Sequence, residues 1–274
     1  MNKLNKQLIV GPWVGEFGWE LFAWQAYARS LSRKYQKTLV ICRKNSEYLY
    51  SDFAENFIFC EPPGGPSDSF YRVGVDTSSL FKKIAVENKD LVQNSVLFMP
   101  RRIGYPPKTH YTESFKFSNH TIVPEYKVYG TKQQKEYDYI FHIRNRELRK
   151  EDNWSISSWK KLKNLLGDDK KVACIGTKES SGCLDDTEDL RDYSLKEVCT
   201  IIRSSSFVFG PSSGPMHLAS LCNTPHIVWS KPENTDRYKN TWNPLGTKVL
   251  FMGDHSWHPT ADYVYEKFCE WKVD

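Results

Sequence analysis

The sequence lacks a long hydrophobic run and a regular pattern of cysteines. No stretch of its 274 residues approaches the ~18 consecutive apolar residues that a membrane-spanning helix needs. Residues 1–7 are polar and have no apolar middle of the kind found in signal peptides. The seven cysteines are odd in number and scattered, and no two form a CxxC pair, which argues against a disulfide framework or a zinc knuckle. We therefore expect a cytoplasmic protein without a transmembrane segment.

Internal repeats and low-complexity segments are also absent, and the charge balance is mildly basic. The net charge of +5 and the pI of about 8.7 fit either ordinary solubility or a polyanionic partner, such as nucleic acid or an anionic membrane face. Aromatic residues make up 14% of the chain, and their faces serve sugar and base binding as well as hydrophobic cores. The length suits one large domain or two modest ones.

Strand and helix patterns alternate along the first half of the chain. Short apolar runs and helical periodicity predict strands at 7–11, 38–42, 57–59 and 96–99, and helices at 19–35 and 79–88. In the first of these helices the apolar residues recur at intervals of three and four, the spacing of one helical face, at Leu21, Trp24, Ala28, Leu31 and Tyr35. The order strand, turn, helix, strand is a βαβ unit and indicates a parallel sheet.

A second alternation follows a polar segment at 130–136, which we interpret as a linker about which two domains close to exclude water. Strands are expected at 139–143, 172–175, 207–209 and 226–229, and helices at 156–166, 194–203, 214–222 and 260–271. Ser194 and Glu197 form a capping box for the second of these helices. The predicted fold class is α/β, with two doubly wound, Rossmann-like domains at 1–132 and 133–274 that face a cleft. Ligands of such folds bind at the carboxyl ends of the strands.

The strongest local signal lies where the strand at 207–209 passes into a helix. A tight turn of Ser212, Ser213 and Gly214 is followed by Pro215 in the first helical turn. Free backbone N–H groups and the helix dipole both favour an anion such as a diphosphate at this point, and the two hydroxyls add donors. The alternative interpretation is an ordinary helix N-cap.

This segment resembles the nucleotide-sugar site of the heptosyltransferase-like glycosyltransferases of the ADP-heptose:lipopolysaccharide type, which have the GT-B fold. Their pattern is Asp-Ser/Thr-Gly, two residues, His-Leu-Ala, then a helix, a proline and a strand. The matching letters here are SSGPMHLA at 212–219 and PHIV at 225–228. The resemblance covers 139–229 well and the first half in outline, and Ser212 departs from it by standing where the family usually has Asp.

The resemblance implies a GT-B-like glycosyltransferase that binds a nucleoside-diphosphate sugar in the second domain and an acceptor in the first. It places Met216 and His217 at the helix start near the phosphates, whereas the alternative for His217 is a core histidine bonded to backbone. In folds of this type the final helix packs back on the first domain, which we expect for the helix at 260–271.

Two further strand ends supply candidates for the same ligand. Arg144 and Arg146 follow the strand at 139–143, and a guanidinium suits a diphosphate leaving group whose charge grows in the transition state. Gly176 and Thr177 follow the next strand and fit a close backbone approach to the base or ribose. The alternative for the arginines is a solvated charged face.

Two carboxylates are candidates for the catalytic base. An inverting glycosyltransferase needs one carboxylate to take the acceptor proton, and the resemblance implies an acidic residue in the glycine-rich turn after the first strand. Glu16 and Glu20 lie there, with Glu20 in the first helical turn, where the dipole alone favours a carboxylate. The surrounding Trp13, Phe17 and Trp19 wall either an acceptor site or a core.

Metal and dinucleotide chemistry receive weaker support. The acidic run at 185–189 is interpreted as a solvated loop, and His255 and His258 lack a third ligand at metal spacing. No GxGxxG pattern is present, which disfavours a dehydrogenase. We therefore expect no metal and no cofactor, the sugar nucleotide being a substrate.

Several functions stay open on the sequence alone. The acceptor is either a surface glycan of lipopolysaccharide type or a hydroxylated, for example hydroxymethyl, base in viral DNA, which the enzyme would flip into its site. The basic residues that suggest DNA lie in a long loop and include Arg101, Arg102, Lys108, His110 and Lys116. A non-catalytic nucleotide or nucleic-acid binding module on the same fold is the alternative to an enzyme, and an epimerase or a hydrolase is a third possibility.

Overall fold

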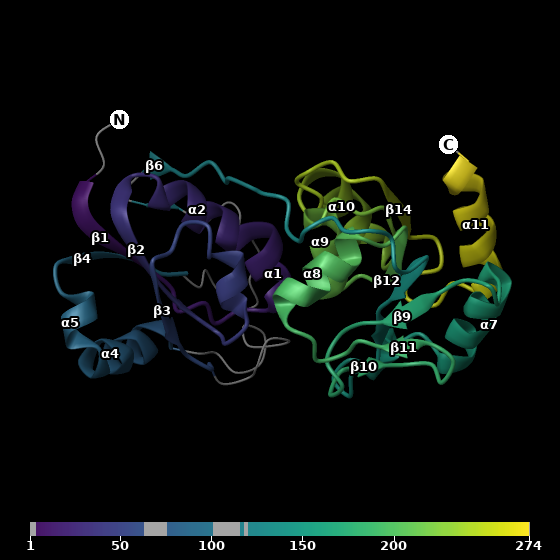
Figure 1. Cartoon of the computed structure of the whole chain (residues 1–274). Helices are drawn as coiled ribbons and strands as arrows, with labels where there is room; N and C mark the ends of the chain where they lie inside the picture. Colours follow the sequence, from purple (N-terminus) through teal and green to yellow (C-terminus); the bar gives the residue numbers. More distant parts are fainter. Residues whose placement is uncertain (1–3, 63–75, 101–115, 118–119, 274) are drawn as a thin grey trace. The chain divides into compact units, whose positions relative to one another are not determined.

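A computed structural model describes residues 4–62, 76–100, 116–117 and 120–273 (Figure 1). The chain divides into two compact units, Met1–Lys127 and Val128–Asp274. The sequence placed this boundary slightly later, between residues 132 and 133. Each unit is built around its own parallel sheet.

The first unit contains a four-stranded sheet in the order β3-β2-β1-β4. Its strands are β1 (Leu4–Val10), β2 (Tyr35–Cys42), β3 (Asn56–Phe59) and β4 (Ser95–Phe98). Separately, β5 (Lys116–Phe117) and β6 (His120–Thr121) pair in antiparallel fashion. The helices are α1 (Phe17–Trp19), a π-helix (Glu20–Trp24), α2 (Gln25–Ser32), a 3-10 helix (Ser46–Leu49), α4 (Thr77–Glu87) and α5 (Lys89–Val92). All four strands of the sheet pair in parallel, as the βαβ pattern predicted.

The first predicted helix is shorter than expected and changes its geometry along its length. It begins as α1, continues through the π-helix and ends at Ser32, and β2 already begins at Tyr35. The prediction of helix up to residue 35 was therefore wrong. Tyr35 fits the helical spacing and is only 4% exposed, but it is buried as the first residue of a strand that pairs with Leu4.

The second unit contains a six-stranded parallel sheet in the order β11-β9-β7-β12-β13-β14. Its strands are β7 (Tyr139–Phe141), β9 (Val172–Cys174), β11 (Glu188–Asp189), β12 (Phe207–Pro211), β13 (His226–Trp229) and β14 (Val249–Met252), and β8 (Ile143–Arg144) pairs with β10 (Ser181–Gly182) beside it. The helices are α7 (Ile156–Leu166), α8 (Leu195–Arg203), α9 (Gly214–Leu221), α10 (Thr235–Asn240) and α11 (Ala261–Val273), with 3-10 turns at Lys150–Asp152 and Pro232–Asn234.

The predicted capping box of α8 is confirmed. The hydroxyl of Ser194 accepts from the backbone of Glu197, and the Glu197 carboxylate accepts from the backbone of Ser194 at 2.9 Å. The core of the unit is aromatic, and the rings of Trp154 and Trp159 pack 4.8 and 5.3 Å from that of Trp229. Sequence reasoning missed β14, an edge strand that is only partly buried over most of its length.

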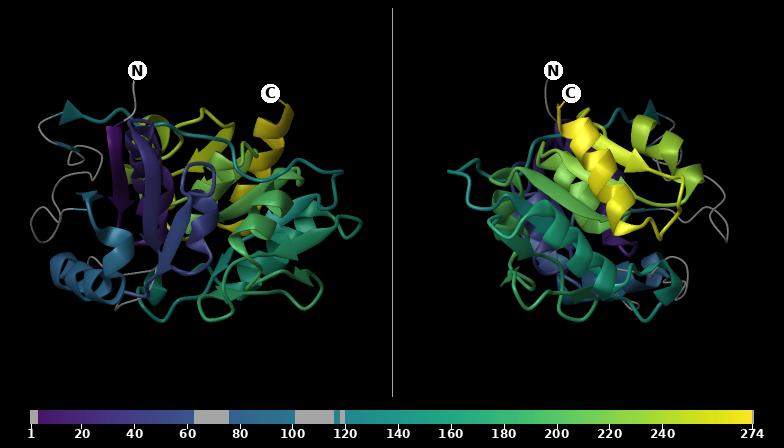
Figure 2. Two further views of the ribbon diagram at one scale, coloured as in Figure 1. Left: turned by 60° about the vertical axis from the view of Figure 1, so that its left-hand side comes forward. Right: turned by 90° about the vertical axis from the view of Figure 1, so that its right-hand side faces the viewer.

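The final helix packs on its own unit. Figures 1 and 2 show α11 alongside α7, and Val264 and Phe268 of α11 are buried in the core of the second unit. The ring of Phe268 lies 6.0 Å from that of Tyr139 and 5.0 Å from that of Phe209. The apolar face that we expected to pack back on the first domain is therefore used within the second unit.

The strand order identifies one switch point in each sheet. In the first unit the chain runs from β1 outward through β2 to β3, and β4 then adds on the other side of β1. In the second unit it runs from β7 through β9 to β11, and β12, β13 and β14 then add on the other side of β7. Both units are thus doubly wound, and ligand sites of such sheets lie beyond the carboxyl ends of the strands where the order reverses.

Candidate functional site

The turn between β12 and α9 leaves the sheet at the switch point of the second unit. The N–H of Ser212 still donates to Trp229 O at 2.9 Å, so sheet pairing continues up to the turn. Ser213 is the extended N-cap of α9, and the first donor within the helix is the N–H of Met216, which bonds Ser213 O at 3.1 Å. The N–H groups at the start of a helix have no acceptor inside it, and Pro215 has no N–H. The N–H groups of Ser213 and Gly214 are therefore the donors offered at the helix entrance.

The entrance is partly exposed, whereas the residues behind it are buried. Residues 212–215 are of intermediate exposure, and Met216 and His217 are 0% and 5% exposed. The ring of His217 stacks on Tyr238 at 5.6 Å and meets the edge of Trp242 at 5.1 Å. Burial, together with the nearby His226, lowers the pKa of His217 to about 3, so its ring is neutral at pH 7. Met216 and His217 thus support the turn from the core.

Two residues that sequence reasoning did not select complete this support. The hydroxyl of Tyr238 donates to Ser212 Oγ at 3.1 Å, and Tyr238 is 1% exposed. Trp242 packs against Tyr238 at 5.2 Å and against His217. Tyr238 lies on α10 and Trp242 follows shortly after its end, so the spacing of four between the two aromatics was the available signal. Together they fix the side chain of Ser212 from behind.

The two predicted arginines lie in different environments. Arg144 is 3% exposed, its Nη2 lies 3.4 Å from Asp152 Oδ2, and its guanidinium lies 5.4 Å from the ring centre of Trp257. Arg146 is partly exposed, and its backbone is held by the side chain of Asn153 through bonds of 3.2 and 2.8 Å. Arg144 therefore organises the loop at 145–153, and Arg146 presents a cation from that loop.

Gly176 and Thr177 form a tight turn at the carboxyl end of β9. Gly176 has φ +130°, and a Cβ there would lie 2.1 Å from Ser181 Oγ, so a larger residue does not fit. Thr177 is exposed, and its hydroxyl lies 2.8 Å from that of Ser180. Because β9, β7 and β12 are neighbours in one parallel sheet, their three following segments leave the same edge. The structure thus brings the predicted donor-site residues of the second unit to one edge.

The glycine-rich turn after β1 occupies the corresponding place in the first unit. Gly11 has φ +101°, and a Cβ there would lie 2.3 Å from Ile41 O, so the turn requires glycine. Glu16 caps the start of α1 with extended backbone and is partly exposed. Trp13 is 1% exposed and stacks on Trp24 at 5.4 Å, which makes it a core residue. Glu16 therefore lies at the turn as a partly exposed residue, with both of its carboxylate oxygens buried.

Glu20, four residues further along the chain, is buried as a whole residue. It is 0% exposed, accepts from Tyr50 Oη at 2.6 Å and lies 3.8 Å from Arg43 Nη1. Burial raises the pKa of Glu20, although Arg43, Tyr50 and Ser46 act in the opposite direction. Glu20 is thus held in a buried polar network, whereas Glu16 is partly exposed as a residue although its carboxylate oxygens are buried, and we keep Glu16 as the first candidate for the base.

The weaker candidates are engaged in structural contacts, and His258 Nε2 lies 2.7 Å from Glu151 O in the loop at 145–153. In the acidic run, Asp185 and Asp186 pair with Lys160 and Lys163, and Glu188–Asp189 forms β11. Among the residues that the structure describes, no group of three His, Cys, Asp or Glu side chains could hold a metal ion. The same residues contain no helix that is both long and apolar enough to cross a membrane.

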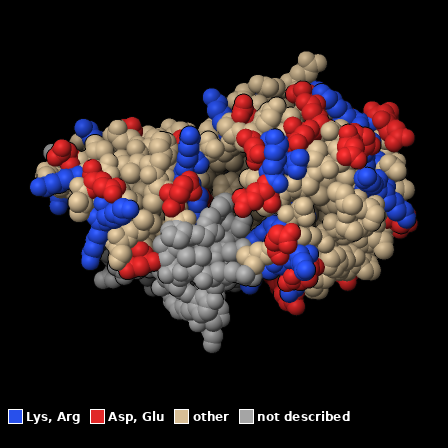
Figure 3. Space-filling view, turned by 90° about the horizontal axis from the view of Figure 1, so that it is seen from below, with Lys and Arg blue, Asp and Glu red and all other residues tan. Residues whose placement is uncertain are grey.

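On the face shown in Figure 3, Lys and Arg side chains are interspersed with Asp and Glu over the described atoms. This face therefore shows no concentrated basic patch of the kind that DNA binding would favour. Of the basic residues that suggested DNA, Arg101, Arg102, Lys108 and His110 lie outside the described residues, and Lys116 is described only as backbone.

Comparison with known proteins establishes the fold. No protein-family model and no curated protein sequence matches the chain. Among solved structures, E. coli heptosyltransferase WaaC with ADP aligns with a TM-score of 0.58 and 13% identity over 97% of this chain and 99% of its own. A family 9 glycosyl transferase from Veillonella parvula gives 0.64 and 9%, covering 99% of both chains. E. coli ADP-heptose lps heptosyltransferase II gives 0.61 and 12%, covering 98% of both. The predicted GT-B-like fold and the resemblance to heptosyltransferases are thus confirmed at the level of the fold.

Proposed function

We propose that this protein is a glycosyltransferase that moves a sugar from a nucleoside-diphosphate sugar to a hydroxyl acceptor. The observation that carries the proposal is the entrance of α9, whose free N–H groups lie at the switch point of a doubly wound sheet. The shared fold supports it, because one structure that aligns over nearly its whole length is a heptosyltransferase with ADP. Fold likeness alone does not assign chemistry, so the proposal rests on the geometry of the edge.

The donor diphosphate binds across the entrance of α9. The N–H groups of Ser213 and Gly214 and the hydroxyl of Ser212 donate to its oxygens, while the dipole of α9 favours its charge. Arg146 supplies a cation, and Arg144 acts as a positioning residue because its guanidinium is buried against Asp152. Met216 and His217 hold the entrance from the core.

The nucleoside lies along the neighbouring strand end. The turn at Gly176 is held closed by its fit against Ser181 and exposes Thr177, whose hydroxyl can bond a ribose or a base. Since β9 and β12 flank β7, a nucleotide laid along this edge passes from one turn to the other.

The transfer is a single displacement. The Glu16 carboxylate takes the proton of the acceptor hydroxyl, whose oxygen attacks the anomeric carbon, and the bond from that carbon to the phosphate oxygen breaks with its electron pair on the diphosphate. This path inverts the anomeric configuration. The N–H groups of α9 and Arg146 stabilise the growing charge of the leaving group, so we propose that the reaction needs no metal.

The acceptor is proposed to be a surface glycan or a glycolipid. This choice follows the structural neighbours, one of which is named as a heptosyltransferase acting on lps. Nothing in the described residues favours a DNA base, so the DNA acceptor is not carried further.

The test is a titration of nucleoside diphosphates and their sugars by isothermal calorimetry, followed by product analysis with a mixed glycan acceptor, with and without EDTA. The proposal expects binding of one nucleotide series, glycosylated product with inverted configuration by NMR, and turnover that resists EDTA. Binding without transfer would support the alternative of a non-catalytic module. Loss of binding in Thr177→Ala, which removes an exposed hydroxyl, with an unchanged melting temperature for the free protein would support the placement of the nucleoside.

A further inference from the structure

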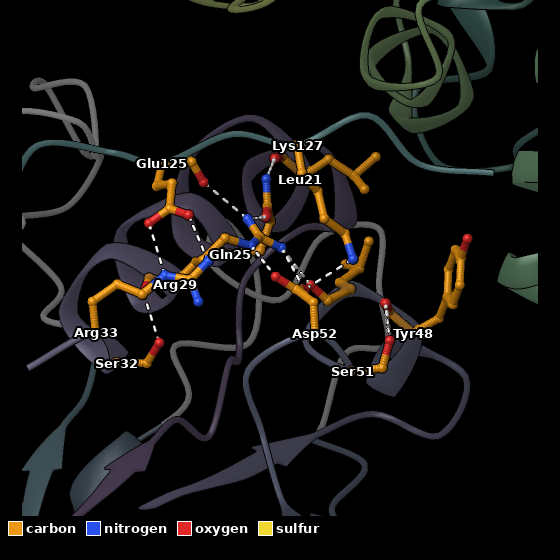
Figure 4. A network of polar contacts seen from close by, with 11 residues as sticks. Leu21, Gln25, Arg29, Ser32, Arg33, Tyr48, Ser51, Asp52, Glu125 and Lys127 are labelled. Carbon is orange, nitrogen blue, oxygen red and sulfur yellow. Dashed lines mark hydrogen bonds and ion pairs between the residues drawn. The ribbon is translucent and has the colours of Figure 1, made fainter. Parts of the chain in front are cut away.

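The chain passes between its two units once, between Lys127 and Val128. On the first side of this point the segment is held by Arg29 of α2, which is 1% exposed (Figure 4). Arg29 Nη1 donates to Glu125 O at 2.9 Å, and Arg29 Nε donates to Asp52 at 2.8 Å. Asp52 in turn pairs with Lys127 Nζ at 2.9 Å. The chain is therefore tied to the first unit up to Lys127.

We call these contacts of Arg29 and Asp52 the first anchor, and further hydrogen bonds reinforce it. The N–H of Glu125 donates to Ala26 O at 3.0 Å, and Tyr126 Oη donates to Phe22 O at 2.6 Å. The pKa of Asp52 is below its ordinary value because the bonds and charges of Arg29 and Lys127 outweigh the effect of burial. A buried arginine whose donors reach two backbone carbonyls and a carboxylate is costly to displace.

On the second side the chain is tied down again at once. The N–H of Tyr129 donates to Leu221 O at 3.0 Å, and Tyr129 is 1% exposed. Arg203 Nη1 donates to Gly130 O at 2.8 Å. Gly130 has φ +77°, and a Cβ there would lie 2.2 Å from Cys199 O, so this glycine allows close packing on α8. The linker that the sequence placed at 130–136 is thus part of the second unit.

Val128 alone stands between these two anchors. It is 38% exposed, and no hydrogen bond joins it to another residue that the structure describes. We infer that Val128 is the hinge between the two units, and that the Arg29 cluster and the packing of Gly130 limit rotation to the dihedral angles that flank it. Hinges are commonly a few residues that absorb a change of φ and ψ between rigid bodies. This inference concerns the connection and does not depend on the identity of the donor.

The first test is hydrogen exchange of the full-length protein without ligand, resolved to single amides. The amide of Val128 should exchange within about tenfold of its unprotected rate, and the amides of Glu125, Tyr129 and Gln133 should be at least ~100-fold slower than theirs. Gln133 belongs to this set because its N–H donates to Ser204 Oγ at 2.9 Å. Protection of Val128 equal to that of its neighbours, or rapid exchange through 129–133, would overturn the inference.

The second test measures the distance between the units by electron-spin resonance. One label is attached to the exposed Cys269 of the second unit and one to Val86→Cys, a position that is 80% exposed in the first, with Cys60 and Cys183 replaced by serine. Gly130→Ala should broaden the distance distribution, because its Cβ cannot fit against α8. The matched control is Gly246→Ala, which also has a positive φ of +63° but meets no atom within 4 Å, and it should leave the distribution unchanged.

Equal distributions for Gly130→Ala and Gly246→Ala would overturn the proposed hinge boundary. Circular dichroism establishes that each variant is folded, and the exchange measurement decides the question on the unmodified chain if Gly130→Ala is unfolded. Neither readout uses activity, so failure of the hinge and failure of the proposed glycosyl transfer are distinguished.

Discussion

A single negative charge at the entrance of α9 provides a sharp test of the donor site. In the variant Ser213→Asp, a carboxylate replaces the hydroxyl of the N-cap residue, whose backbone is extended at φ −165° and ψ 173°. The Ser213 hydroxyl does not cap α9 but donates to Pro211 O at 2.9 Å, so losing it should lower the free energy of unfolding without ligand by about 0.5–1.5 kcal/mol. The same carboxylate would compete with a diphosphate for the N–H groups of Ser213 and Gly214.

The expected loss of affinity follows from the distance. A carboxylate about 5 Å from a phosphoryl charge, at an effective dielectric constant of about 20, raises the binding free energy by about 3 kcal/mol. Salt reduces this value at a partly exposed site, so we expect the Kd for nucleoside diphosphate to rise about 10- to 100-fold. The effect should shrink as salt concentration increases.

Calorimetric titration is the assay, and Ser213→Asn is the matched control, since Asn has nearly the same shape as Asp without the charge. Asn should bind the nucleotide within about threefold of the parent protein. If Asp and Asn bind equally well while both are folded, the diphosphate is not at this helix and the reasoning is refuted.

Further predictions concern the two carboxylates and the buried histidines. Glu16→Gln should retain nucleotide binding and lower kcat by about 10²-fold or more, because a general base is lost. Glu20→Gln should retain kcat and lower the free energy of unfolding by about 1–3 kcal/mol, because the buried carboxylate that accepts from Tyr50 is replaced by an amide. Equal kcat for both variants in steady-state assays would contradict these roles. Burial lowers the pKa of His142 and His226 to about 4 and that of His217 to about 3. Below pH ~6.5 the unfolded chain binds protons that the folded chain does not, so stability should fall as pH drops from ~6.5 toward ~4, by at most about 4 kcal/mol per pH unit for the three. Urea unfolding between pH 7 and 5 measures this slope. The slope should be smaller by about a third in His217→Gln than in the parent protein. An equal slope in the two proteins would contradict a lowered pKa for His217.

Much of the framework was predictable because it depends on local patterns. Apolar runs located β1, β2, β12 and β13, and the pair Ser194 and Glu197 located the start of α8, since both signals act within a few residues. The turn at 212–214 was found for the same reason.

What could not be predicted depends on tertiary contacts. Arg144 and Arg146 look alike in the sequence, but Asp152 and Trp257 bury the first of them. Glu16 and Glu20 likewise look alike in the sequence, but only Glu20 is 0% exposed, with Arg43 and Tyr50 against its carboxylate. Trp257, Arg43 and Tyr50 lie more than 20 residues from the side chains they contact, and Asp152 meets Arg144 only through the fold of the intervening loop, so none of these contacts leaves a local signal.

The predicted linker at 130–136 also depended on contacts that the sequence does not show. A polar stretch beginning with glycine is typical of a flexible connection, and residues 130–136 were interpreted in that way. Gly130 is instead required because only a hydrogen fits against Cys199 O. A glycine's role in packing is decided by the atoms it faces, and these belong to α8.

The central claim is that the entrance of α9 binds phosphoryl oxygens, and a crystal structure with a nucleoside diphosphate tests it most directly. The account predicts phosphate oxygens within about 3.2 Å of the backbone nitrogens of Ser213 or Gly214. A nucleotide bound elsewhere, with this entrance occupied only by solvent, would contradict it.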